Sequence, residues 1–270
     1  MKTWMVFAAA LMCAGSALAQ QRGGAKASAK VRPEASMIRI RAITGVGGDG
    51  DYTVAAPQVD EKFKKKINHT DSYAKDSVKG WHFFEVAYQV RSEDASGKPI
   101  LVLPEVEITY ALLYDMTRSK HAAGVAGRAK KAGGAIGWDN PKQLYSLFTE
   151  TVTYTSVTPG REHYAAVCVP PSSVAVYGTP MIFSAQVKVN GVQQGEIMTQ
   201  VSGKPAIEGK SLESLLVTPG RDGKAHPAAW WDQIENLSQA VIRRDGILRD
   251  RSMTPFALAG DMYYDQVKAK

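Results

Sequence analysis

Apolar and polar side chains alternate with a period of two along much of this chain. Phe183 and Ala185, for example, flank Ser184. Successive side chains of an extended strand point to opposite faces, so this alternation is typical of strands with one buried face. The alternation therefore predicts a protein built mainly from β-strands.

The pattern predicts at least seven strands, with turn residues between most of them. They cover residues 37–44, 81–90, 105–114, 151–157, 164–169, 181–189 and 192–201. Asn190-Gly191 between the last two is suited to a tight hairpin turn, which needs positive φ at both positions. Strands and helices do not alternate regularly, which argues against a doubly wound sheet. We expect a mainly β protein, specifically an antiparallel β-sandwich.

The alternation also assigns residues to the interior of the sandwich. We expect one face of three strands to be buried, namely Phe84, Val86, Tyr88, Ile108, Tyr110, Leu112, Phe183, Ala185 and Val187. Glu105 and Glu107 have the opposite parity and are expected on a solvated face.

The N-terminus has the pattern of a secretory signal peptide. Lys2 precedes an apolar run at residues 4–12, and small residues then lead to Ala17-Leu18-Ala19. The apolar run is shorter than the ~20 residues of a membrane-spanning helix. We therefore expect cleavage after Ala19, export, and no transmembrane span in the mature chain. Lipid attachment at Cys13 is a minor alternative, because the residues before it are not small.

Composition divides the chain into four segments. Residues 1–19 form the signal peptide, and residues 20–36, rich in Gly, Ala, Ser and Lys, are expected to be a flexible tether. The sandwich is expected at residues 37–202 and a C-terminal extension at residues 203–270.

Helices are predicted at only two places. Apolar residues spaced at i, i+4, i+7 and i+11 after Pro227 predict a helix at residues 227–241, packed on the sandwich. A shorter helix is predicted at residues 141–148, and residues 256–264 are expected to dock back as a strand.

No motif in the sequence indicates catalysis, a cofactor or a metal. The five histidines form neither H-E-x-x-H nor a Cys/His cluster; they are His69, His82, His121, His163 and His226. Residues 45–50 match G-x-G-x-x-G, but an extended sequence follows where a dinucleotide site needs a helix. Asp49 and Asp51 supply too few oxygens for firm calcium binding. We expect a non-enzymatic protein with no catalytic, cofactor-binding or metal-binding residues; an exported hydrolase with an unrecognised site is a remaining alternative.

Cys168 is the only cysteine left once the signal peptide is removed. It lies within the apolar sequence AAVCV, so we expect a small buried side chain with an inert thiol.

The formal net charge of +7 can attract anionic partners. Residues 122–137 are rich in glycine and basic residues and contain no acid, as expected of a long loop between strands. Such loops often carry binding function. Arg128, Lys130 and Lys131 are the candidate interaction residues. An anionic glycan is a possible partner, and no feature indicates nucleic acid.

Several segments resemble the immunoglobulin-like proteins of the pilus-associated gene cluster of Akkermansia and related Verrucomicrobia. They are ALAQ at the end of the signal peptide, WHFFEVAYQV, VEITYALLYD, YAAVCVPPSSVAVYG, MIFSAQVKVNG and PAAWWDQIENL. The resemblance implies an immunoglobulin-like sandwich, similar to domains of archaeal type IV pilus subunits. It also implies a role at the cell surface, and for an exported protein the outer membrane and the periplasm are the other expected locations. The expected partners are other pilus-associated proteins or host surface molecules, and no active-site residues are implied.

One departure from pilins affects the implied function. A type IV pilin keeps its apolar N-terminal segment as the helix that polymerises, whereas cleavage after Ala19 would remove it here. A structural or adhesive accessory role is therefore expected rather than a fibre subunit. A periplasmic or surface module that binds a glycan or an anionic ligand is the alternative.

Export generates the first testable prediction. The mature protein is expected to begin at Gln20, because signal peptidase cleaves after small residues arranged as A-x-A. N-terminal sequencing of the exported protein checks this. A mature chain that retains residues 4–12 would contradict it and would restore the fibre-subunit hypothesis.

Overall fold

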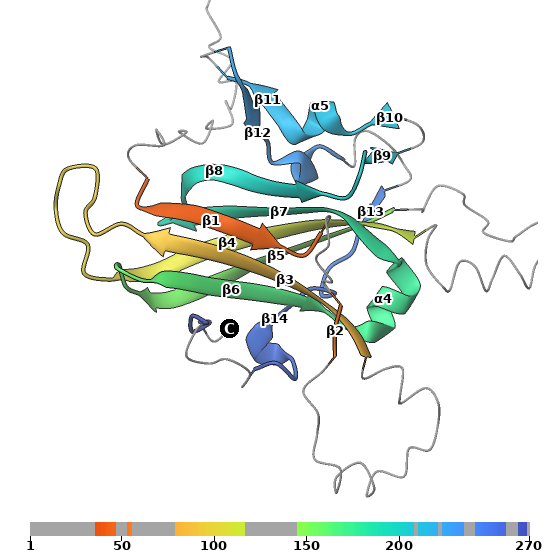
Figure 1. Ribbon diagram of the computed structural model, residues 1–270, viewed down its shortest axis with the longest axis horizontal. Coiled ribbons are helices and arrows are strands. Elements are labelled where there is room, and N and C mark those ends of the chain that lie inside the picture. Colours follow the sequence, from red (N-terminus) through yellow and green to blue (C-terminus); the bar gives the residue numbers. More distant parts are fainter. Residues whose placement is uncertain are drawn as a thin grey trace, which may run out of the picture.

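The computed structural model describes residues 36–46, 53–55, 79–116, 145–207, 210–220, 223–234, 241–257 and 264–268. Within these residues, two β-sheets pack face to face (Figure 1). No helix among them is long and apolar enough to cross a membrane.

The first sheet has the strand order β1-β3-β6-β14, and β2 pairs with β3. Its strands are β1 (Ile38–Thr44), β2 (Thr53–Ala55), β3 (Lys79–Val90), β6 (Glu162–Val169) and β14 (Arg249–Asp250). The second sheet has the order β13-β5-β4-β7-β8. Its strands are β4 (Leu103–Asp115), β5 (Tyr145–Val157), β7 (Thr179–Val189), β8 (Val192–Val201) and β13 (Val241–Arg243).

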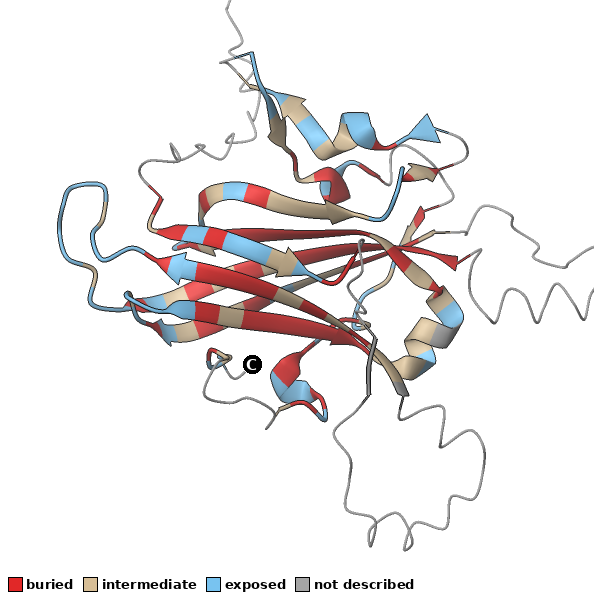
Figure 2. Ribbon diagram, viewed as in Figure 1, coloured by how far each residue is buried: buried red, intermediate tan, exposed pale blue. Residues whose placement is uncertain are grey.

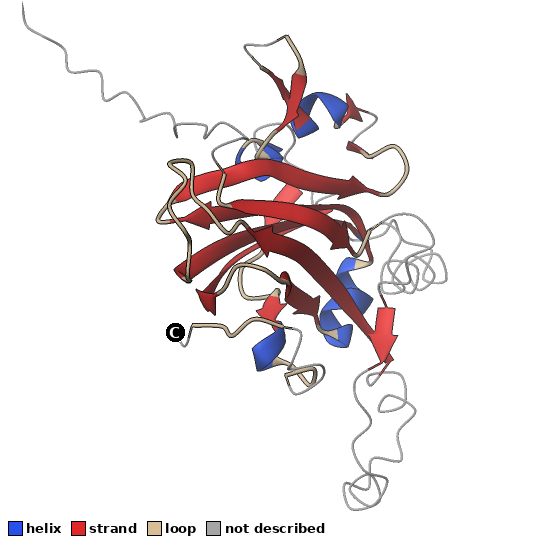
Figure 3. Cartoon of the chain, turned by 60° about the vertical axis from the view of Figure 1, so that its left-hand side comes forward, coloured by secondary structure: helices blue, strands red, loops and turns tan. Residues whose placement is uncertain are grey.

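The remaining elements are short and lie outside the two sheets (Figure 3). Two hairpins pair β9 (Ala206–Ile207) with β10 (Lys210–Ser211) and β11 (Val217–Pro219) with β12 (Ala225–Pro227). The helical elements bounded within the described residues are α4 (Pro171–Tyr177), α5 (Glu213–Leu216) and the 3₁₀ turns η3 (Trp230–Asp232) and η4 (Arg251–Met253).

The seven predicted strands are confirmed as β1, β3, β4, β5, β6, β7 and β8. The hairpin between β7 and β8 has positive φ at both turn residues, 50° at Asn190 and 73° at Gly191. The sequence therefore sets this turn locally, because Asn and Gly tolerate positive φ.

The predicted core is also confirmed. All nine side chains assigned to the interior are fully buried, and they come from both sheets (Figure 2). The rings of Phe84 and Phe183 meet across the sheets with centroids 5.3 Å apart and planes tilted by 61°. This inter-sheet aromatic packing makes the two sheets one sandwich.

Both predicted helices need correction. Tyr145 to Phe148 belong to β5, and the rest of the predicted helix at 141–148 lies outside the described residues. The predicted helix at 227–241 begins at a residue of β12 and ends at the first residue of β13. Trp230–Asp232 form a 3₁₀ turn and Ile234 is helical, and residues 235–240 lie outside the described residues. At the two ends of the predicted helix, strand pairing replaces it: Pro227 pairs within the β11–β12 hairpin, and Val241 to Arg243 pair with β5.

Two further expectations change. The β13–β5 pair is parallel, so the sandwich is not entirely antiparallel. The predicted strand at residues 256–264 is not found where the structure describes these residues, namely at 256, 257 and 264. Phe256 lies in a turn, and Tyr264 makes a single bridge to Tyr164.

A second apolar cluster covers part of the outer face of the second sheet. Ala111 and Leu113 on β4 pack there with Trp230 and Trp231. The indole N–H of Trp230 donates to Ser184 Oγ at 2.7 Å, so the buried polar atom of this large side chain is satisfied. The segment after β8 is thereby fastened to the sandwich.

The inter-sheet core gives a stability prediction. Phe183→Ala should lower the free energy of unfolding by about 3–5 kcal/mol, because it removes a fully buried ring and leaves a cavity. Chemical denaturation followed by intrinsic fluorescence measures this loss. Val192→Ala, at a 42 % exposed position of β8, is the control and should change it by less than about 0.5 kcal/mol. A loss below about 1 kcal/mol for Phe183→Ala would show that the face assignment is wrong.

Candidate functional site

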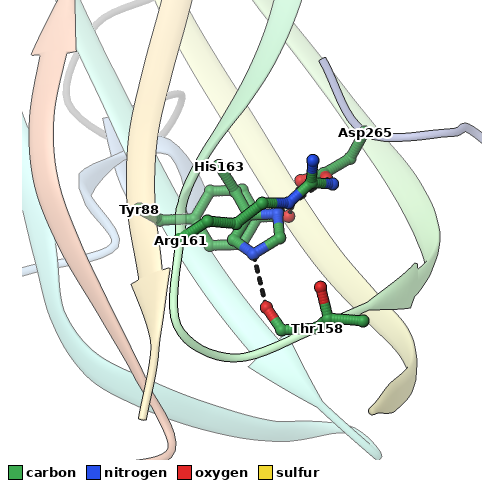
Figure 4. Close-up of polar contacts among 5 residues, drawn as sticks. All are labelled: Tyr88, Thr158, Arg161, His163 and Asp265. Atoms are coloured by element: carbon green, nitrogen blue, oxygen red, sulfur yellow. Dashed lines mark hydrogen bonds and ion pairs between the residues drawn. The ribbon is translucent and has the colours of Figure 1, made fainter. Parts of the chain in front are cut away.

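Four polar residues from distant parts of the chain meet at one side of the sandwich. We call them the Asp265 cluster: Tyr88 on β3, Arg161 before β6, His163 on β6 and Asp265 in the segment 264–268 (Figure 4). The side chains of His163 and Asp265 are 0 % and 3 % exposed. These titratable groups are therefore held almost without contact with water.

Every hydrogen-bonding atom of the imidazole and the carboxylate has a partner. His163 Nδ1 lies 2.7 Å from Asp265 Oδ1, and Nε2 lies 2.6 Å from the backbone oxygen of Thr158. The Tyr88 hydroxyl donates to Asp265 Oδ2. The imidazole also stacks on the Tyr88 ring, with centroids 5.2 Å apart. The cluster thus satisfies polar groups that would otherwise be costly to bury.

These contacts define which atoms carry hydrogens. A carbonyl oxygen only accepts, so His163 Nε2 must be a donor to Thr158. Burial raises the pKa of Tyr88, and the charge of Asp265 raises it further, so the hydroxyl stays protonated and donates. Arg161 Nη2 lies 3.5 Å from Asp265 Oδ1 and adds a positive charge from the solvent side. Asp265 is the shared acceptor of the cluster.

The His163–Asp265 pair resembles half of a catalytic triad, but its outer nitrogen is not available for proton transfer. A general base needs a ring nitrogen within reach of a substrate proton. Here Nε2 is bonded to a backbone carbonyl, and the side chain has no exposed surface. The chemistry that this arrangement supports is attachment of one chain segment to another.

The attached segment joins the two sheets. The Asp265 N–H donates to the oxygen of Tyr164 on β6, at 3.1 Å. On β5, the Thr155 N–H donates to Gln266 O at 2.9 Å, and the Lys268 N–H donates to Thr153 O at 2.8 Å. Residues 264–268, which we call the strap, therefore bond to one strand of each sheet and close this side of the sandwich.

Aromatic contacts hold the start of the strap against the outer face of the first sheet. The Tyr264 hydroxyl donates to Glu85 Oε2 at 2.5 Å, and the Arg251 guanidinium lies 4.3 Å from the centre of the Tyr264 ring. Phe256 meets Trp81 and Phe83 edge-on, with centroids 5.7 and 5.6 Å apart. Phe256, together with Tyr264 of the strap, covers an aromatic patch of β3.

Cys168 is buried, as predicted. It has 0 % exposure on β6, and burial raises the pKa of its thiol to about 12. The thiol stays protonated at neutral pH, and a protonated thiol is a poor nucleophile.

The other residues singled out in the sequence do not converge. Among the histidines in the described ranges, His82 Nδ1 lies 2.8 Å from the Tyr114 hydroxyl and His226 Nδ1 lies 3.2 Å from Glu196. No group of three or more His, Cys, Asp or Glu side chains that could hold a metal occurs in the part of the chain that the structure describes. His69, His121 and the predicted interaction residues Arg128, Lys130 and Lys131 lie outside it.

The sequence contained one signal for the Asp265 cluster. His163 shares the parity of the buried residues Ala165 and Val167 on β6, so it lies on an inward face where a titratable residue needs a partner. Nothing local identified that partner, because Asp265 is 102 residues away in the chain.

Fold and cluster together define a two-sheet β-sandwich protein whose buried polar groups fasten its own C-terminal segment. A protein-family model matches residues 135–270, half of the chain, and the chain belongs to that family. A crystal structure of a protein from Akkermansia muciniphila is similar, with 15 % identity and a TM-score of 0.49, over 86 % of this chain and 93 % of that chain. No curated protein matches the chain.

The Asp265 cluster gives the next prediction. Asp265→Ala should lower the free energy of unfolding by about 3–5 kcal/mol, because it leaves buried partners of a charge unpaired. Amide hydrogen exchange should also become faster throughout the strap. The control is Glu105→Gln, which alters the exposed pair between Glu105 and Lys268 and should cost less than about 1 kcal/mol. Equal losses for the two variants, or unchanged exchange in the strap of Asp265→Ala, would contradict the attachment role.

Proposed function

We propose that this protein is an exported, non-enzymatic structural or adhesive component of the bacterial cell surface or outer membrane. One observation carries the proposal. The buried His–Asp pair, which is the arrangement closest to an acid–base site, has its hydrogen-bonding atoms committed to holding the strap. The signal-peptide pattern at residues 1–19 supports a location outside the cytoplasm.

The covering of two sheet edges limits which surfaces of the protein can contact other molecules. An uncovered strand edge pairs readily with other chains, and the strap bonds to edge positions of β5 and β6. Contacts of the folded protein therefore fall to its side chains and surface clefts rather than to these edges.

We further propose that the protein is an accessory component of a type IV pilus-like system. This proposal rests on the resemblance of the strand and hairpin segments to immunoglobulin-like proteins of pilus-associated gene clusters. On the same resemblance, we propose that the strands of the sandwich are connected as in an immunoglobulin-like domain. The expected partners are other pilus-associated proteins or host surface molecules.

A specific observation also favours the second function, a surface module that binds a glycan or an anionic ligand. Three arginines, Arg39, Arg41 and Arg91, line one cleft between β1 and β8. This cleft is compatible with the adhesive role, and it would give that role a ligand.

Surface labelling in the native host tests the proposal. Intact cells are treated with a membrane-impermeant amine reagent, then fractionated, with a cytoplasmic and a periplasmic protein as markers. The protein should be labelled in intact cells and recovered with the outer membrane or the medium, because export and surface display expose its lysines. Recovery with the cytoplasmic marker, without labelling, would refute the proposed function.

A further inference from the structure

A cleft of about 550 Å³ lies where an edge strand of the first sheet approaches an edge strand of the second. We call it the β1–β8 cleft. It is lined by Ser36, Ile38, Arg39, Ile40, Arg41, Arg91, Gly195, Glu196 and Met198. Its volume is in the range of small-molecule sites, ~300–1,000 Å³.

Side chains, not a backbone ladder, join β1 to β8. The Met37 N–H donates to Gln194 Oε1 at 2.9 Å, and the Val46 N–H donates to Gln200 Oε1 at 2.8 Å. In the described part of the chain, the strand pairing of β1 is with β3 and that of β8 is with β7. The two glutamine contacts fix the strands at both ends of β1 and leave the space between them open.

Two backbone features shape the cleft. The register of β1 against β3 skips Arg41, which is a β-bulge, and a bulge of this kind re-aims a side chain at a sheet edge. Gly195 has φ +66°, and a Cβ placed on it would touch Ile38 O at 3.6 Å and Ser36 Oγ at 3.7 Å. A side chain at residue 195 would therefore extend into the cleft.

The charges that line the cleft are strongly unbalanced. Arg39, Arg41 and Arg91 are all exposed, and the Arg91 N–H donates to Met37 O at 2.9 Å, which places Arg91 beside the start of β1. Glu196 is the acidic residue of the lining, and it lies 3.2 Å from His226. Guanidinium groups bind carboxylate and sulfate through paired N–H donors, so this rim is suited to an anionic group.

The floor of the cleft is apolar. Ile38 is 1 % exposed and Ile40 is 9 % exposed, so they close the bottom of the cleft, and the partly exposed Met198 supplies its apolar surface. A ligand for this cleft therefore combines an apolar face with anionic substituents. A pyranose ring bearing a carboxylate or a sulfate has both, because its C–H groups form an apolar face.

A second cleft provides a useful contrast. It has about 410 Å³, and it lies over Thr109, Thr151 and Lys188 of the second sheet. Its arginine, Arg243, donates to Thr149 Oγ1 at 3.3 Å and to Trp231 O at 3.0 Å, and Asp232 also lines it. Positive and negative groups are mixed there, so an excess of positive charge distinguishes the β1–β8 cleft.

We propose that the β1–β8 cleft binds an anionic oligosaccharide, with Arg39 and Arg41 hydrogen-bonded to its carboxylate or sulfate groups and Met198 against a sugar ring. The choice of a sugar rests on the proposed function outside the cytoplasm, where acidic glycans combine an apolar ring face with anionic groups. The choice of an anion rests on the arginines alone.

Isothermal titration of the purified mature protein tests the site. The probes are 3′-sialyllactose, a fully sulfated heparin disaccharide, neutral lactose and sodium sulfate. At least one of the two anionic sugars should bind, with an affinity that falls as ionic strength rises, because exposed charges are screened over ~10 Å at 0.1 M salt. Lactose and free sulfate should bind at least about tenfold more weakly, since each lacks one part of the recognised chemistry.

Matched variants locate the binding. Arg39→Ala/Arg41→Ala should weaken the anionic sugar by about tenfold or more. Arg249→Ala/Lys210→Ala removes two positive charges at exposed positions elsewhere and should change the affinity less than about twofold. Thermal unfolding checks that each variant is folded, and Arg39→Gln/Arg41→Gln replaces the alanine pair if that pair is not.

Four results would overturn the proposal: no binding of either anionic sugar, equal binding of lactose, equal binding of free sulfate, or equal weakening by the control pair. Equal binding of sulfate would identify a site for small inorganic anions instead. The titration uses purified protein, so its failure would leave the result of surface labelling intact, and a cytoplasmic location would not alter the titration.

Discussion

Two stacked sheets bury their inner faces against each other, but the strands at their edges keep unpaired backbone N–H and C=O groups. In this protein each pair of facing edges is treated differently. On one side, Gln194 and Gln200 join β8 to the backbone next to β1. On the other side, the strap bonds to both β5 and β6. The Phe84–Phe183 packing forms the core, but these edge contacts decide which surfaces stay accessible.

The Asp265 cluster shows how a buried charge can specify position. A buried ion pair adds little net stability compared with apolar packing, because desolvation offsets most of the attraction. However, few other arrangements of the chain would provide a buried carboxylate with all of its hydrogen-bond partners. Asp265 accepts from Tyr88 and contacts His163, and His163 donates onward to Thr158. A strap shifted by one residue would bury the carboxylate without these partners, so the cluster sets the register of the strap.

Local sequence patterns were sufficient for the strands, their inward faces and the Asn190-Gly191 turn, because each depends on neighbouring residues only. They failed where distant segments decide the structure. The apolar spacing after Pro227 predicts a helix that runs to Val241, yet Pro227 lies in β12 and Val241 pairs with Tyr145 on β5. Trp230 does pack on the second sheet, as that prediction required. The partner of His163 and the glutamine contacts beside β1 were equally hidden, since the latter span 157 and 154 residues.

The position of the strap in the chain also determines the order in which the fold can be completed. Tyr88 and Asp265 are separated by 177 residues, so their bond closes one of the longest loops in the molecule. A chain that emerges from a ribosome or a membrane channel with its N-terminus first exposes β5 and β6 well before residue 265 is available. During that interval two strand edges are open to pairing with neighbouring chains, which is a known route to aggregation. A chain exported as proposed would therefore carry these two uncovered edges until the strap is available to pair with them.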